Sequence, residues 1–186
     1  MRQINENLLE LNVQDSLDES LSENYLKIFL SGPIDLNNTF DWHSKFISGV
    51  SRLVDPKEGD PRLNNNKYII LNSKIDISNP DISLENPEFV SKIQWELQMI
   101  DKSDVIFCNF LKKSKSPFGM NGFMLSAMSN KIIVRCPEEY MYYPYIKLIT
   151  DTYNIPLLGD TSTIIDVLFE FYKSIPKFNK IINYGF

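Results

Sequence analysis

The types and spacing of Gly119, Asn121 and Gly122 are compatible with phosphate binding. Two glycines and a small amide at a helix start leave backbone N–H groups accessible, and such groups can hold a phosphate. The stretch lacks the Lys-Ser/Thr ending of a P-loop and is not GxGxxG. An ordinary strand-to-helix turn is therefore the alternative interpretation. The three lysines within residues 112–115 are better explained as a solvated loop face than as a phosphate clamp.

The single histidine and the two cysteines restrict the other chemistry that this chain can carry. His43 is the only histidine, so the chain has few residues that could form a zinc site or a Ser-His-Asp triad. Cys108 and Cys136 lie inside apolar runs, which predicts buried thiols on adjacent strands, not a disulfide or a metal pair. We expect neither a metal nor a cofactor.

Charge and composition exclude two further classes of partner. The 19 basic and 24 acidic residues give a net charge of −5 over 186 residues. Direct nucleic-acid binding needs a basic face that neutralises phosphates, so we do not expect it. No basic start is followed by an apolar run, and no stretch approaches the length of a membrane span. We therefore expect a cytoplasmic protein without membrane contact.

Apolar runs that alternate with amphipathic segments must position these residues. Five runs predict strands, within residues 27–35, 67–75, 104–111, 131–137 and 155–159. Helical spacing predicts helices within residues 40–54, 87–102, 119–130, 138–153 and 162–175. Because the strands are continuously apolar, we expect a parallel five-stranded α/β sheet with helices on both faces, Rossmann- or flavodoxin-like. Ligands of such folds bind beyond the carboxyl ends of the strands.

Residues 1–24 are polar and acidic and differ from the rest of the chain. Their scattered leucines are compatible with one weak amphipathic helix, which could pack on a partner subunit. The alternative is a flexible or loosely docked extension. We therefore divide the chain into an N-terminal extension, residues 1–24, and one α/β domain, residues 25–186.

The aromatic stretch in residues 138–153 has three possible roles. It contains Tyr140, Tyr142, Tyr143 and Tyr145. These side chains could pack in a helical core, form a subunit interface, or line a pocket in which a base stacks.

Four stretches together resemble the nucleoside 2-deoxyribosyltransferases and the related nucleoside 5′-monophosphate N-glycosidases. They are IFLSGPID at 28–35, ILNSK at 70–74, IQWELQMIDKSDVIFCNF at 93–110 and SPFGMNGFMLSAMSNKIIVRCP at 116–137. No single stretch is specific, but their order and spacing are. The resemblance spans residues 27–160 and implies a deoxyribosyltransferase-like fold, a nucleoside or nucleotide ligand, and a homo-oligomer, dimeric or larger.

The resemblance also implies a catalytic role for Glu96. In the family a glutamate attacks or stabilises the anomeric carbon while an acid assists departure of the base. Glu96 falls eight residues before Asp104, where the family has its second catalytic carboxylate. We expect Ile93, Leu97 and Ile100 on the buried helix face, which would turn Glu96 towards the strand ends. The alternative is a solvent-facing helix charge.

The resemblance places a set of substrate-binding residues around the strand ends. Ser31 to Ile34 resemble a turn that cups the sugar, although a plain tight turn is the alternative. Asp35 could contact a ribose hydroxyl or cap the next helix. Asp104 opens a strand, where an aspartate is more often a helix–strand junction cap than a catalytic group. Phe29 takes a position that is a tyrosine in some members, and it lacks the hydroxyl. The full set is Phe29, Ser31, Gly32, Pro33, Ile34, Asp35, Asp104, Asn109, Ser116, Gly119 and Asn121.

Gly122 occupies the position of the family's nucleophilic glutamate. The alignment from Ser116 to Lys131 needs no gap, and no acidic residue lies between Asp104 and Glu138. Glycine has no side chain, so no covalent glycosyl intermediate can form there. Two interpretations follow: an enzyme that acts on N-glycosidic bonds through Glu96, or a catalytically inactive nucleotide-binding, sensing or assembly subunit. An unrelated flavodoxin-like binding domain is a third.

Overall fold

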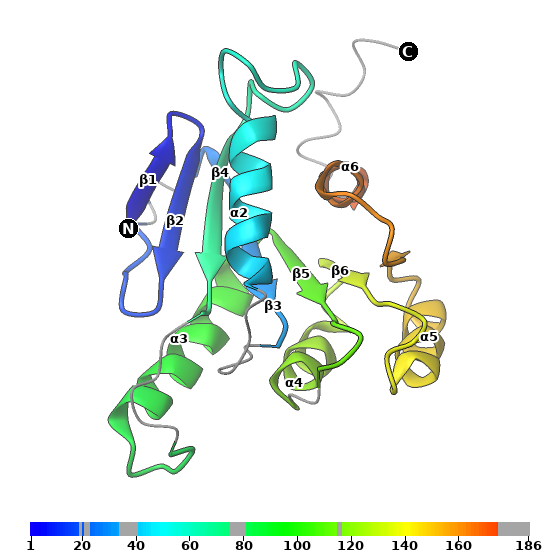
Figure 1. Ribbon diagram of the computed structural model, residues 1–186. Coiled ribbons are helices and arrows are strands. Elements are labelled where there is room, and N and C mark those ends of the chain that lie inside the picture. Colours follow the sequence, from blue (N-terminus) through cyan, green and yellow to red (C-terminus); the bar gives the residue numbers. More distant parts are fainter. Residues whose placement is uncertain (19, 21–22, 34–40, 75–80, 115–116, 175–186) are drawn as a thin grey trace. The chain divides into compact units, whose positions relative to one another are not determined.

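The computed structural model describes residues 1–18, 20, 23–33, 41–74, 81–114 and 117–174 (Figure 1). They fall into two compact units. The first unit comprises Met1–Leu30 and Leu36–Ser103, and the second comprises Ser31–Asp35 and Asp104–Phe186.

The first unit contains a four-stranded sheet in the order β1-β2-β4-β3. Its strands are β1 (Arg2–Asn5), β2 (Leu8–Asn12), β4 (Lys67–Asn72) and β3 (Tyr25–Ser31). Ser31, the last residue of β3, belongs to the second unit. β1 is antiparallel to β2, whereas β2 and β3 both run parallel to β4. The sheet is therefore mostly parallel.

The described part of the first unit also contains the helices α2 (Trp42–Leu53) and α3 (Pro87–Lys102). The Asp41 side chain accepts a hydrogen bond from the Ser44 N–H and so begins α2. The Asn86 side chain accepts hydrogen bonds from backbone N–H groups in the first turn of α3, and Pro87 is the first residue of that helix. Both starts follow from capping chemistry that the sequence carries locally.

The buried face of α3 differs from the prediction. Lys92, Trp95 and Met99 are its buried residues, whereas Leu97 is 50% exposed. Apolar spacing alone was misleading here, because a lysine takes a buried position through an ion pair with Glu96 four residues later.

The N-terminal residues form a β-hairpin, and not the flexible extension or the weak amphipathic helix that the sequence left open. Leu8, Leu9, Glu10 and Leu11 are all buried in β2. Glu10 can lie inside because the Arg2 guanidinium binds its carboxylate and Asn72 Nδ2 donates to it over 2.8 Å. A charged residue in the middle of the strand concealed this strand from the hydropathy pattern.

The second unit contains three parallel strands in the order β5-β6-β7. They are β5 (Val105–Asn109), β6 (Ile132–Arg135) and the short β7 (Leu157–Leu158). Its helices are α4 (Pro117–Ser126), α5 (Tyr143–Thr152) and α6 (Ile164–Ser174). Phe107 of β5 meets Phe171 of α6 with ring centroids 6.5 Å apart, edge to face.

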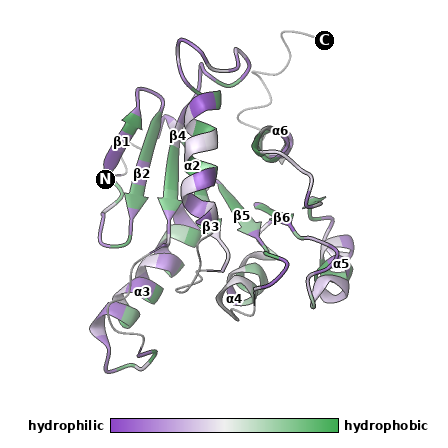
Figure 2. Cartoon of the chain, viewed as in Figure 1, coloured by the Kyte–Doolittle hydropathy of each residue, from purple (hydrophilic) through white to green (hydrophobic). Residues whose placement is uncertain are grey.

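The prediction of an α/β fold with a mostly parallel sheet flanked by helices is confirmed, but its strand count is corrected from five to seven. All five predicted strands are present, and Figure 2 shows how hydrophobic β4 and β5 are. The two additional strands are those of the hairpin. A boundary near residue 24 stays a prediction. In the part of the chain that the structure describes, no helix combines the length and apolarity that crossing a membrane requires.

Candidate functional site

The turn after β3 packs directly on helix α4 in the second unit. Gly32 and Pro33 are buried, and a Cβ added to Gly119 would lie 3.5 Å from atoms of both. Gly119 and Gly122 are three residues apart and therefore share one face of α4. We call Ser31, Gly32, Pro33, Gly119 and Gly122 the glycine contact.

Ser31 occupies the space that any side chain at position 122 would need. A Cβ built on Gly122 would lie 2.2 Å from Ser31 Oγ and 3.4 Å from Ser31 Cβ. Non-bonded atoms in proteins stay well beyond the shorter of these two distances, since attraction is optimal near about 3.5–4.0 Å. Glycine at 122 is thus required by space and not by its backbone angles. A glutamate side chain at position 122 and the Ser31 hydroxyl would compete for one volume.

Cys108 lies beneath the same contact. Its thiol is buried in β5, lies 3.7 Å from the Gly119 carbonyl oxygen and is hydrogen-bonded with the Ser31 hydroxyl. Burial raises the pKa of Cys108 to about 12, and the Ser31 hydrogen bond offsets only part of this shift. The thiol is therefore protonated at neutral pH and does not replace the glutamate as a nucleophile.

Gly122 lies inside α4, not in a loop that precedes it. Because the helix begins at Pro117, only the N–H groups of its first four residues lack an intrahelical acceptor. Gly119 belongs to that first turn, whereas Gly122 does not, and the Asn121 side chain is exposed. Residues 119–122 thus form part of a helix and not a loop, whereas a phosphate site there stays a prediction.

Arg135 joins the carboxyl ends of β5 and β6. Its Nη1 donates to Asn109 Oδ1 over 3.2 Å, and its Nη2 donates to Asp160 Oδ1 over 3.0 Å. Asn109 is only 3% exposed. Among the described residues, the buried Arg135 Nε has no hydrogen-bond partner. Arg135 was missed from the sequence, although its place at a strand end was a usable signal.

Glu96 is ion-paired with Lys92 in the first unit. The Lys92 side chain is 5% exposed and that of Glu96 is 20% exposed, so both are shielded from bulk water. An ionised carboxylate in such a pair accepts hydrogen bonds. Glu96 is therefore ion-paired and mostly shielded from solvent, and its catalytic role stays a prediction.

A second charged cluster lies at the start of α2. Asp41 Oδ2 lies 2.6 Å from Lys74 Nζ, and Asp41 also accepts hydrogen bonds from Ser44. Burial opposes ionisation of Asp41, but the hydrogen bonds from Lys74 and Ser44 prevail and lower its pKa to about 2. The Asp41–Lys74 pair thus persists far below neutral pH.

His43 stacks on Trp42 with ring centroids 3.8 Å apart and is 2% exposed. Burial lowers the pKa of His43 to about 3; Asp41 opposes this shift, and Lys74 and Lys92 add to it. The ring is neutral at pH 7 and cannot be the acid that protonates a leaving base.

The other predicted residues lie as follows. Phe29 is 2% exposed and packs on Trp95 with ring centroids 6.4 Å apart. Asp104 is half-buried ahead of β5. Ile34, Asp35 and Ser116 lie outside the described residues. The structure thus brings Ser31, Gly32, Pro33 and Gly119 together, and the roles assigned to the individual residues stay predictions.

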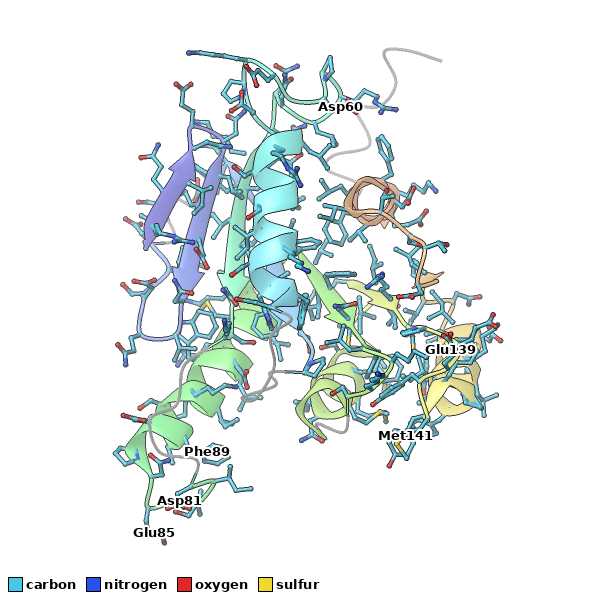
Figure 3. All side chains as sticks on the ribbon, viewed as in Figure 1. Asp60, Asp81, Glu85, Phe89, Glu139 and Met141 are labelled. Carbon is cyan, nitrogen blue, oxygen red and sulfur yellow. The ribbon has the colours of Figure 1, made fainter. Side chains whose placement is uncertain are left out.

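The aromatic stretch divides between core and surface. Tyr140 is 3% exposed and packs on Phe110, with ring centroids 5.1 Å apart. Tyr145 is 47% exposed, and its hydroxyl lies 3.5 Å from Met124 Sδ of α4. Other large apolar side chains are exposed on α4, α5 and their flanks; they are Leu125, Met128, Met141, Tyr142 and Leu148. Met141 lies beside α5 in Figure 3. We call this set the α4–α5 surface.

A family model described as nucleoside 2-deoxyribosyltransferase like matches residues 25–140, which is more than half of the chain. The chain belongs to this family. The match contains β3 and α4, and with them the glycine contact, while the β1–β2 hairpin lies before it. A comparison with curated protein sequences gives no match. The family resemblance predicted from the four sequence stretches is confirmed.

Proposed function

We propose that this member of the family binds a nucleoside or nucleotide and does not cleave its N-glycosidic bond through a glutamyl nucleophile. One observation carries the proposal: Ser31 Oγ lies 2.2 Å from the position of a Cβ at residue 122. The difference at position 122 is therefore more than the absence of a carboxylate, because the Ser31 side chain fills the space that a Cβ there would need. In this proposal the protein is a sensing, sequestering or assembly subunit.

Two features support retained binding of the ligand. The turn from Ser31 to Pro33 is packed and buried, as expected of a preformed surface for a sugar. Arg135 offers a cation at the carboxyl end of β6, where parallel sheets bind ligands, and its buried Nε has no acceptor among the described residues. We infer that the guanidinium would pair with a phosphate group of the ligand, which predicts a preference for nucleotides over nucleosides.

The second candidate is an N-glycosidase that depends on Glu96. The observation that favours it is the shielding of Glu96, whose side chain is only 20% exposed next to a buried lysine. A carboxylate held in this way could stabilise positive charge on a sugar ring without covalent attack. Direct attack by water would then replace double displacement.

The α4–α5 surface supports a proposal of homo-oligomer formation. Met128, Met141 and Leu148 are between 63% and 76% exposed, and we propose that a second copy of the chain covers them. Sedimentation of Leu148→Glu against the unmodified chain tests this. A lower sedimentation coefficient supports assembly through this surface, and an unchanged value excludes it.

The decisive experiment combines base release with thermal stabilisation. The protein is incubated with deoxynucleosides, deoxynucleotides and NAD, free base is measured by chromatography, and the melting temperature is recorded with each ligand. We expect no base release but a raised melting temperature with at least one nucleotide, since a ligand of the native state raises stability. Base release that Glu96→Gln abolishes would instead establish the second candidate.

A further inference from the structure

Arg135 lies at the carboxyl ends of three neighbouring parallel strands in the second unit. Asn109 at the end of β5 is in register with Arg135 at the end of β6, and Arg135 is in register with Leu158 at the end of β7. The Arg135 guanidinium donates both to the Asn109 side chain and to Asp160, which lies just beyond β7. One cation therefore joins a buried strand end to the exposed segment that leads into α6.

The two partners of Arg135 differ in how firmly the fold holds them. Asn109 is 3% exposed and belongs to β5, so its side-chain oxygen has a fixed position. The Asp160 side chain is 66% exposed, whereas that of Arg135 is only 23% exposed. Ion pairs with an exposed carboxylate contribute little net stability, because water and salt screen them. Asp160 is therefore the exchangeable partner of the guanidinium.

Asp160 occupies the nitrogen that a phosphate would need. Nη2 of Arg135 donates to the Asp160 main-chain carbonyl oxygen over 2.6 Å and to its Oδ1 over 3.0 Å. Arginine binds phosphate through two parallel N–H groups, which come either from Nε and Nη2 or from Nη1 and Nη2. Both of these pairs include Nη2. A phosphate that binds Arg135 through two hydrogen bonds must therefore displace Asp160.

The segment between β7 and α6 has space in which to move. Gly159 and Asp160 are exposed, and nothing lies within 4 Å of a Cβ added to Gly159. At the far end of the segment the Thr163 hydroxyl donates to Asp166 Oδ2 over 2.8 Å, which fixes the start of α6. Both residues of β7 pair with β6. The ends of the segment are thus held without Arg135, and residues 159–162 can change conformation between them.

We propose that Asp160 is a built-in competitor of the ligand phosphate at Arg135. A phosphate group takes two parallel N–H groups of the guanidinium and displaces Asp160, after which residues 159–162 adopt another conformation. This competition presupposes the proposed nucleotide binding and adds its regulation. A nucleoside without phosphate leaves Asp160 in place, whereas a phosphate monoester carries more negative charge than one carboxylate and displaces it. The segment then differs between the free and the bound protein, as a sensing subunit requires.

Isothermal titration calorimetry with the full chain tests the competition. The probes are the common deoxynucleoside 5′-monophosphates, deoxyadenosine and inorganic phosphate, so that a nucleotide phosphate is distinguished from free phosphate. We expect Asp160→Asn to bind the phosphate-bearing probes several-fold more tightly than the unmodified chain, and Arg135→Gln to bind them at least tenfold more weakly. Asp151→Asn is the matched control, because Asp151 is an exposed carboxylate of the same unit that is ion-paired with Lys147. It should leave every affinity unchanged.

Nuclear magnetic resonance reports on the displacement itself. The Arg135 Nε–H and Ser162 amide resonances should shift when a phosphate-bearing probe binds the unmodified chain. In ligand-free Asp160→Asn both resonances should already lie part of the way towards their bound positions, because removal of the charge shifts the population in the same direction. Resonances of ligand-free Asp160→Asn that stay at the free positions would contradict the proposal.

The affinities separate failure of this competition from failure of the proposed function. Nucleotide binding that is equal in Asp160→Asn and in the unmodified chain would overturn the competition and leave the proposed function intact. Tighter binding of inorganic phosphate by Asp160→Asn, without binding of any nucleotide, would support the competition and refute the proposed function. If Asp160→Asn binds none of the probes, or if Asp151→Asn tightens binding to the same extent, the proposal is wrong.

Discussion

The contact between Ser31 and Gly122 makes a quantitative prediction about stability. Gly122→Ala places a Cβ 2.2 Å from Ser31 Oγ, so the serine must rotate or α4 must shift. Overpacking of this kind costs about 1–3 kcal/mol, whereas glycine to alanine inside a helix otherwise gains about 0.5–1 kcal/mol. We expect Gly122→Ala to destabilise the protein by about 1–2 kcal/mol.

Removing the serine hydroxyl should reverse the sign of this effect. In the Ser31→Ala background the nearest remaining atom is the Cβ of residue 31, at 3.4 Å, which is ordinary van der Waals contact. Gly122→Ala should then stabilise by up to about 1 kcal/mol. The double-mutant cycle should therefore give a coupling of about 2 kcal/mol.

Urea unfolding followed by circular dichroism measures all four members of the cycle. Gly159→Ala is the control for crowding, because nothing lies within 4 Å of the added Cβ. It should change the free energy of unfolding by less than about 0.5 kcal/mol. If Gly122→Ala has the same effect with and without the Ser31 hydroxyl, the steric account of Gly122 is wrong.

Three further predictions concern the Ser31–Gly122 contact, His43 and Cys108. Gly122→Glu alone should release no base from any nucleotide, whereas the double variant Ser31→Ala/Gly122→Glu should release detectable base, measured by chromatography. Neutral His43 has a pKa of about 3 when folded and about 6.5 when unfolded, so the unfolded chain binds more protons between these values. Stability should therefore fall from pH 6.5 to pH 4 with a slope of up to about 1.4 kcal/mol per unit, and His43→Gln should flatten this dependence in urea titrations. The pKa of Cys108, raised to about 12 by burial, predicts alkylation by iodoacetamide at pH 8 only as fast as the protein unfolds, which mass spectrometry can follow; rapid labelling of the native protein would contradict its burial.

The sequence predicted those elements whose signals are local. The five apolar strands and the helices within residues 40–54 and 87–102 were predicted from neighbouring residues, whereas the cap at Asp41 was not predicted although its signal is local. The hairpin strand β2 was missed, because Glu10 is buried through Arg2 and Asn72, and Asn72 is distant in sequence. Hydropathy cannot reveal a partner that only the fold supplies.

The candidate site likewise contains features with a local sequence signal and features that depend on residues distant in sequence. Gly122 could be placed at the nucleophile position by alignment, but the reason for a glycine there could not be read from the sequence. It depends on a rotamer of Ser31 and on the approach of a turn to α4. The Lys92–Glu96 pair, in contrast, has the spacing of a helical ion pair and could have been predicted from its four-residue separation.

The steric account changes how the loss of the glutamate should be tested. If Gly122 were an isolated substitution, restoring glutamate would restore the nucleophile, and a failed rescue would mean that the rest of the pocket had changed. With Ser31 Oγ in the same volume, failure of the single variant is expected even in an intact pocket. Only the variant that also removes the hydroxyl reports on the other residues. The residues at 31 and 122 must therefore be changed together before activity, or its absence, can be assigned to Glu96.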